Sequence, residues 1–173
     1  MTLLADHASP YLAHSLPKRA KLQWQEEGLH VLLADASGSA ALEEFIQQSC
    51  NQDYVNLGVM ESEEVEQNLI HLHPKHLLAI GTEPFLQKID ALAWKLRLPH
   101  LQTQRFGEDK RDVLCMNCRK ILKSVRFRIQ TCDCGFYLLV RDHYSARRGL
   151  YQGAALPPDD PLIQSLSHQK LGP

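Results

Sequence analysis

The sequence predicts a mixed α/β protein: a small three-layer domain with a parallel sheet, followed by a small β-rich module that carries cysteines. Three observations lead to this prediction. Short apolar runs alternate with amphipathic segments between residues 28 and 106, four of the five cysteines fall within twenty residues, and apolar residues alternate around those cysteines. Strand–helix alternation with short connections is typical of a parallel sheet covered by helices.

The α/β domain is expected over residues 28–106, after an N-terminal arm over residues 1–27 that has a strand near Leu22. Apolar runs of strand length predict the strands of the parallel sheet. These strands are expected at 29–34, 54–59, 76–81 and 100–105. Amphipathic segments between them predict helices, and Pro84 suits the first turn of the last one. The helical segments are AALEEFIQQSC, SEEVEQNLIHL and the stretch from Pro84 to Leu96.

Three further segments follow the α/β domain. GEDKRD, residues 107–112, reads as a charged linker, and residues 113–155 form the β-rich module. Within the module, apolar residues between the cysteine pairs alternate with Arg126 and Arg128, as in one strand of a hairpin. Residues 156–173 contain four prolines and are expected to be an extended tail with a short helix at most.

The cysteines fall into two pairs. Cys115 and Cys118 have two residues between them, Cys132 and Cys134 have one, and thirteen residues separate the pairs. Four thiolates suit a tetrahedral zinc, and paired ligands on tight turns let backbone amides face the sulfurs. Gly135 directly after Cys134 permits such a turn. The sequence therefore predicts a structural zinc in a zinc-ribbon-like module.

Two alternatives to zinc remain at these cysteines. An iron–sulfur cluster also uses four cysteines, though its common spacings differ. A redox pair would involve Cys132 and Cys134, but such pairs usually have two intervening residues. A module of about forty residues buries too little apolar surface to fold alone, which favours a metal that supports folding.

Composition restricts the compartment and the partners. No apolar run approaches the roughly 20 residues of a membrane-spanning helix. The N-terminal residues lack the pattern of a secretory signal, so we expect a cytoplasmic protein with reduced thiols. Net charge is −1, but residues 105–148 carry eleven Lys and Arg against five Asp and Glu. A basic module joined to an acidic one is typical of an interaction surface.

The segment VRDHYSARRGLYQG, residues 140–153, is a candidate docking surface. Arginines beside tyrosines suit contacts with carboxylates or phosphates. The alternative is a solvated loop in which Asp142 pairs with an arginine. The candidate docking residues are Arg141, His143, Tyr144, Arg147, Arg148 and Tyr151.

No catalytic residues are predicted, because the sequence lacks a recognisable Ser/His/Asp order, an open three-ligand metal site and a dinucleotide fingerprint. DASGS at 35–39 is interpreted as a helix cap rather than a phosphate loop. GTEPF at 81–85 leaves open a nucleotide or flavin site at a strand end. HLHPKH at 71–76 is interpreted as a helix end, and Cys50 as a small buried residue.

CMNC, CDCG and VRDHYSARRGLYQG together resemble the C-terminal region of the DmmA-like subunit of bacterial dimethylamine monooxygenase. The resemblance implies an accessory subunit of a system that oxidatively removes a methyl group from a secondary amine. It also implies oxygenase and reductase partners that carry the heme or flavin. Neither a membrane nor a nucleic acid is expected as a partner. The alternatives are a nucleic-acid-binding zinc ribbon and a flavin- or nucleotide-binding oxidoreductase component.

Overall fold

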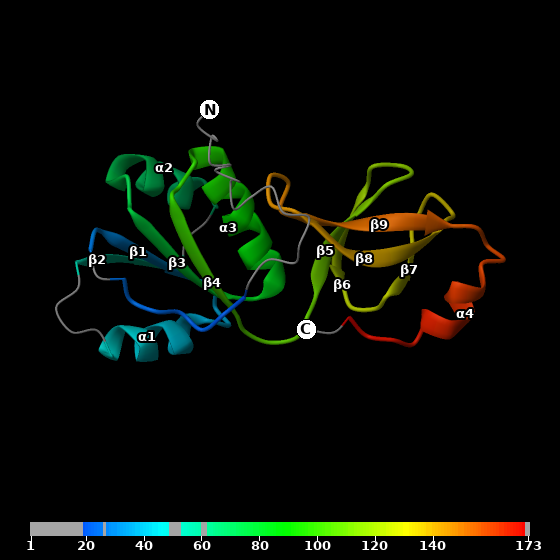
Figure 1. Ribbon diagram of the computed structural model, residues 1–173, viewed down its shortest axis with the longest axis horizontal. Coiled ribbons are helices and arrows are strands. Elements are labelled where there is room, and N and C mark those ends of the chain that lie inside the picture. The colour runs from blue at the N-terminus through cyan, green and yellow to red at the C-terminus, as the bar shows by residue number, and fades with distance from the viewer. Residues whose placement is uncertain (1–18, 26, 49–52, 60–61, 172–173) are drawn as a thin grey trace, which may run out of the picture.

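The computed structural model describes residues 19–25, 27–48, 53–59 and 62–171. Two sheets lie side by side along the long axis of the molecule, with helix α3 facing the second sheet (Figure 1). The first sheet is parallel and has four strands, and the second has five. The predicted fold class, a parallel α/β unit followed by a β-rich part with a cysteine cluster, is confirmed.

The parallel sheet has the strand order β2-β1-β3-β4. β1 and β3 are continuous apolar runs buried along their whole length, as expected of central strands covered on both faces. The four strands are β1 (His30–Ala34), β2 (Tyr54–Gly58), β3 (His76–Gly81) and β4 (His100–Arg105).

Helices cover both faces of this sheet, which gives the predicted three layers (Figure 1). Successive strand residues point to opposite faces, so Val31 packs with α2 and α3, whereas Leu32 packs with α1. The helices are α1 (Ser39–Gln47), α2 (Ser62–Leu72) and α3 (Glu83–Leu96). Among the described residues, no helix is both long and apolar enough to cross a membrane.

The described part of the N-terminal arm runs beside β4. Leu22 is buried under the α1 face, and its backbone N–H donates to the side chain of Gln104 at 3.0 Å. The strand predicted near Leu22 does not form, because glutamine side chains rather than a backbone ladder hold this segment. A single bridge pairs Arg19 with Thr103.

The second sheet has the order β6-β5-β9-β8-β7. β5 pairs with β9 in parallel, and the other pairings are antiparallel. β5 begins inside the segment 107–112 that the sequence predicts as a linker, because Asp109 and Asp142 neutralise the buried Arg111. The strands are β5 (Arg111–Cys115), β6 (Ile121–Val125), β7 (Ile129–Thr131), β8 (Tyr137–Ser145) and β9 (Leu150–Leu156).

The single strand predicted between the cysteine pairs is wrong: β6 and β7 are separate strands at opposite edges of the sheet. The chain crosses between them at residues 126–128, where it pairs with the C-terminal tail. Leu171 N donates to Arg126 O, and Arg128 N donates to Gln169 O. The tail itself forms the short helix α4 (Pro161–Leu166), capped by the Asp160 side chain, before it returns to this crossing.

Candidate metal centre and the interface between the sheets

Two tight turns present the four cysteines. The first turn follows β5: Cys115 N donates to Lys120 O, and Arg119, with a φ of 65°, turns the chain back. The second follows β7, where Gly135 has a φ of 87° and donates its N–H to Cys132 O. In each turn the residue directly after the second cysteine has positive φ. Only glycine adopts this conformation without strain, which accounts for Gly135.

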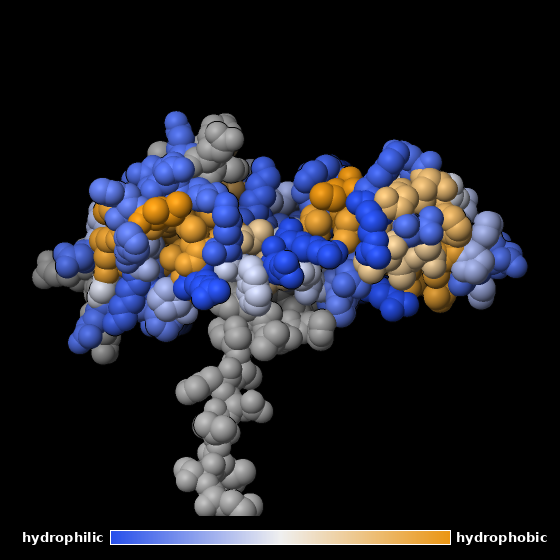
Figure 2. Space-filling view, turned by 90° about the horizontal axis from the view of Figure 1, so that it is seen from above, coloured by the Kyte–Doolittle hydropathy of each residue, from blue (hydrophilic) through white to orange (hydrophobic). Residues whose placement is uncertain are grey.

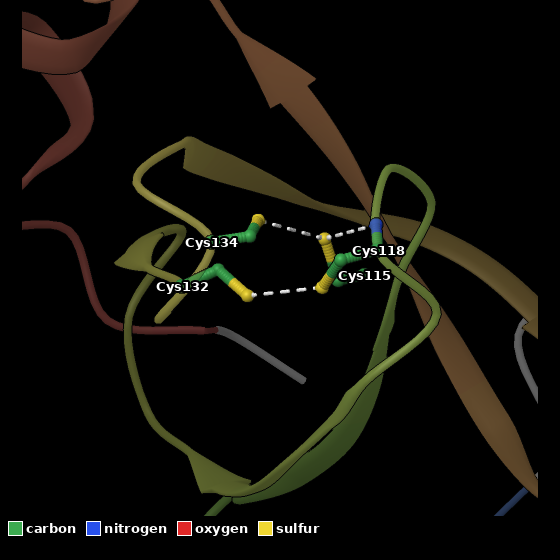
Figure 3. A group of neighbouring side chains, drawn as sticks. All are labelled: Cys115, Cys118, Cys132 and Cys134. Atoms are coloured by element: carbon green, nitrogen blue, oxygen red, sulfur yellow. Dashed lines mark hydrogen bonds between the residues drawn. The ribbon is translucent and has the colours of Figure 1, made fainter.

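The four sulfurs point toward one another (Figure 3). The Sγ–Sγ distance is 3.9 Å between Cys115 and Cys134 and 3.6 Å between Cys118 and Cys132. All four sulfurs lie within 4.8 Å of one another. Ligands about 2.3 Å from one tetrahedral ion would stand about 3.8 Å apart. Thiolates on the different irons of a cluster stand farther apart, so the geometry fits a single ion.

Backbone amides face these sulfurs, as the spacing predicts. Cys118 N donates to the Cys115 sulfur at 3.5 Å (Figure 3). The backbone N–H of Phe136 lowers the pKa of Cys134 to about 6, and the neighbouring thiols assist. The backbone N–H of Cys134 also lowers the pKa of Cys132, but burial and the other three thiols outweigh it and raise that pKa to about 12. The cluster therefore favours a shared negative charge, which a cation would stabilise.

Strand packing positions the cysteines. Cys115 ends β5 and Cys132 follows β7, and both pack with Leu138 of β8 in a small core below the sulfurs. Among the described residues, these four cysteines form the group that could hold a metal ion. His71 and His73 lie at the end of α2, whereas His76 is buried in β3 against the ring of His30. The HLHPKH stretch therefore does not converge on an ion.

The candidate docking residues divide into two groups. Arg141, Arg147 and Arg148 are exposed, and His143 is half-buried. Tyr144 and Tyr151 are buried, at 5% and 3% exposure, because the segment forms the β8–β9 hairpin that packs against α3. Asp142 pairs with Arg111 at 2.7 Å, which is an internal pairing with an arginine of the kind that the alternative interpretation expects.

A buried polar network joins the two sheets, and sequence reasoning missed it. Arg19 makes two-pronged contacts with both carboxylates of α3, at 2.9 and 3.2 Å from Glu83 and at 2.7 and 3.0 Å from Asp90. Tyr144 donates its hydroxyl hydrogen to Asp90, and Tyr151 donates to Glu83. Burial raises the pKa of Asp90 against the opposing effect of Arg19. The signal in the sequence is the helical spacing of Glu83, Gln87 and Asp90.

The strand ends of the parallel sheet carry a different arrangement. The Asp35 carboxylate accepts hydrogen bonds from the backbone N–H and hydroxyl of Thr82, at 2.8 and 2.7 Å, and from Gly38 N at 2.9 Å. It thereby ties the end of β1 to Gly38 and Thr82, the N-cap residues of α1 and α3, although no side chain caps either helix. A carboxylate at this crevice repels phosphate, which disfavours a nucleotide at GTEPF.

Fold and site together define a parallel α/β unit joined through α3 to a β-rich part that presents a four-cysteine cluster. Residues 112–154 match the family model of the dimethylamine monooxygenase subunit DmmA-like C-terminal domain. The match confirms the predicted resemblance, covers most of the second sheet and includes all four cysteines. Over these residues the chain is similar to the C-terminal domain of DmmA-like dimethylamine monooxygenase subunits. Searches of curated proteins and of solved structures gave no match.

Proposed function

We propose that the protein is a non-catalytic accessory subunit of a multicomponent, dimethylamine monooxygenase-like oxidative N-demethylase. The observation that carries the proposal is the overlap of the DmmA-like match with the cysteine cluster. In this proposal the chain works in the cytoplasm, and oxygenase and reductase partners hold the heme or flavin. The exposed arginines after the cluster dock those partners.

The metal in the proposal is one structural zinc held by all four cysteines. The sulfur separations support a single tetrahedral ion, and four thiolates leave no open position for substrate. Zinc would hold the first turn, which extends β5, against the second turn, which follows β7. The chain would thus divide into an N-terminal arm, an α/β domain, a module held together by zinc and a C-terminal tail.

Metal analysis of the purified chain tests this assignment. We expect one zinc per chain and no visible absorption. Replacing Cys115 or Cys132 with Ser should abolish zinc binding and loosen the second sheet, whereas Cys50→Ser should keep the zinc, because Cys50 lies outside the cluster spacing. Iron with visible absorption, or full zinc content in Cys115→Ser, would contradict the proposal.

The subunit role is tested by purifying a tagged chain from its native host and identifying the proteins bound to it. Oxygenase and reductase components should copurify. The complex should consume dimethylamine with oxygen and a reductant, and the isolated chain should not. Removing the chain should reduce turnover by the remaining components. Unchanged turnover without the chain would refute an accessory role, and turnover by the chain alone would make it an enzyme.

A further inference from the structure

A cleft of about 770 Å³ lies beside the junction of α3 with the second sheet and is lined by residues of both. Its floor is the part of α3 where the half-buried Phe85 and Leu92 lie about 10 Å apart, with Ile89, which is buried in the core of the first unit, between them. Ile121 of β6 and Leu150 of β9 face this floor from the other sheet. Figure 2 shows hydrophobic residues gathered over each half of the molecule, with hydrophilic residues between them.

Five cations also line the cleft. Lys95 pairs with Glu66 at 2.6 Å, and Lys123 pairs with Asp112 at 2.7 Å, so the two acids that line the cleft are already neutralised. Three more cations that line the cleft, Lys88, Arg147 and Arg148, are exposed and have no ion pair with any described residue. The cleft therefore carries three excess positive charges.

Gln87 and Asp112, two polar residues that line the cleft, already have hydrogen-bond partners within the chain. The Gln87 amide donates to Asp112 O and to Gly149 O and accepts from Asp112 N. The Asp112 carboxylate accepts from Ser124 N and Lys123. Small-molecule sites have polar groups on the floor that fix the ligand's orientation. An apolar centre with a charged rim is instead the anatomy of a protein interface, in which Arg and Trp are enriched.

We propose that this cleft binds an acidic amphipathic helix of a partner protein. The spacing of the α3 floor suits the apolar face of a second helix laid along it, and acidic residues flanking that face would meet Lys88, Arg147 and Arg148. The proposal rests on the proposed function for the identity of the partner as a monooxygenase component. It identifies which of the exposed arginines act in docking: Arg147 and Arg148 line the cleft.

The probe is a synthetic helical peptide with leucines along one face and glutamates elsewhere, beside a scrambled peptide of the same composition. Trp94 lines the cleft, so its fluorescence reports binding. We expect the ordered peptide to bind more tightly than the scrambled one. The double substitution Arg147→Glu, Arg148→Glu should weaken binding at least about tenfold. Arg126→Glu with Lys170→Glu is the matched control, because both residues are exposed and lie outside the cleft.

The same variants are then used to capture partners from the native host. Loss of the copurifying subunits in the cleft variant, but not in the control, supports the inference. If those subunits bind the cleft variant normally, the cleft assignment is overturned while the proposed function stands. If the peptide binds but no monooxygenase component copurifies, the proposed function fails and the cleft assignment stands. The two variants are also compared for binding of duplex DNA, binding of flavin mononucleotide and self-association. If the cleft variant loses one of these more than the control does, the inference is overturned in favour of that occupant.

Discussion

Gln87 of α3 and Asp112 of β5 exchange two hydrogen bonds through the Gln87 side chain and the Asp112 backbone. Gln87 Nε2 donates to Asp112 O at 2.9 Å, and Asp112 N donates to Gln87 Oε1 at 2.8 Å. The second Nε2 hydrogen reaches Gly149 O at 2.9 Å. The amide thus continues the hydrogen bonding of the second sheet onto a helix of the first unit, so the two units have a specific junction rather than a loose contact.

Replacing Gln87 with Glu should destabilise this junction. The carboxylate would face the carbonyl oxygens of Asp112 and Gly149 without a hydrogen to donate. An unpaired buried acceptor costs about 1–3 kcal/mol, and more where a group is charged. Urea unfolding should show this loss, whereas Gln164→Glu on the exposed face of α4 should change stability by less than about 0.5 kcal/mol. Equal stabilities of the two variants would contradict the junction.

Gly149 should not tolerate alanine. It has a φ of 60°, and an added Cβ would lie 2.1 Å from the carbonyl oxygen of Gln87. Gly107 also has positive φ, at 88°, but nothing lies within 4 Å of an added Cβ there. Gly107→Ala should therefore lower the free energy of unfolding by only about 1–2 kcal/mol, the cost of the left-handed backbone conformation. Gly149→Ala should lose clearly more by urea unfolding, and equal losses would show that the hairpin does not pack closely on α3.

Sequence reasoning predicted the elements that depend on residues close together in the chain. The apolar runs of β1 and β3 predicted buried parallel strands, and the spacing from Cys115 to Cys134 predicted four converging thiols. Both features depend on the periodicity or spacing of residues that are close in sequence, and the sequence shows these directly. The interpretation of DASGS as a helix cap is wrong in detail, because Gly38 is the N-cap residue of α1 and no side chain caps the helix, whereas Asp35 holds the preceding turn through Gly38 N.

Features that depend on distant segments could not be predicted in this way. Arg19 and Asp90 are 71 residues apart, and nothing near either residue indicates the other. Phe127 interrupts the strand predicted between the cysteine pairs because Lys170 of the tail pairs with it. The sequence predicts Tyr144 and Tyr151 as docking residues, but the β8–β9 hairpin buries both of them against α3. In each case a contact distant in sequence overrides the local pattern.

Replacing Arg19 alone should lower stability more than replacing Arg19 together with Glu83 and Asp90. Arg19→Met leaves Glu83 and Asp90 buried without their cation, which typically costs about 3–5 kcal/mol. Adding Glu83→Gln and Asp90→Asn to that variant removes the uncompensated charges and should recover much of the loss. Thermal or urea unfolding measures both. Lys95→Met, which breaks an exposed pair with Glu66, should lose no more than about 1 kcal/mol.

The buried tyrosines should make the protein sensitive to alkali. Burial, reinforced by the Asp90 charge, raises the pKa of Tyr144 well above its ordinary value of 10.0. Above about pH 10 the unfolded chain releases this proton while the folded chain keeps it, so the free energy of unfolding falls as pH rises. Urea unfolding between about pH 8 and pH 11 should show a smaller fall in Tyr144→Phe than in the wild type. Tyr54→Phe, at a position 39% exposed, should keep the full slope. Parallel slopes in all three proteins would mean that Tyr144 does not control the alkaline limit.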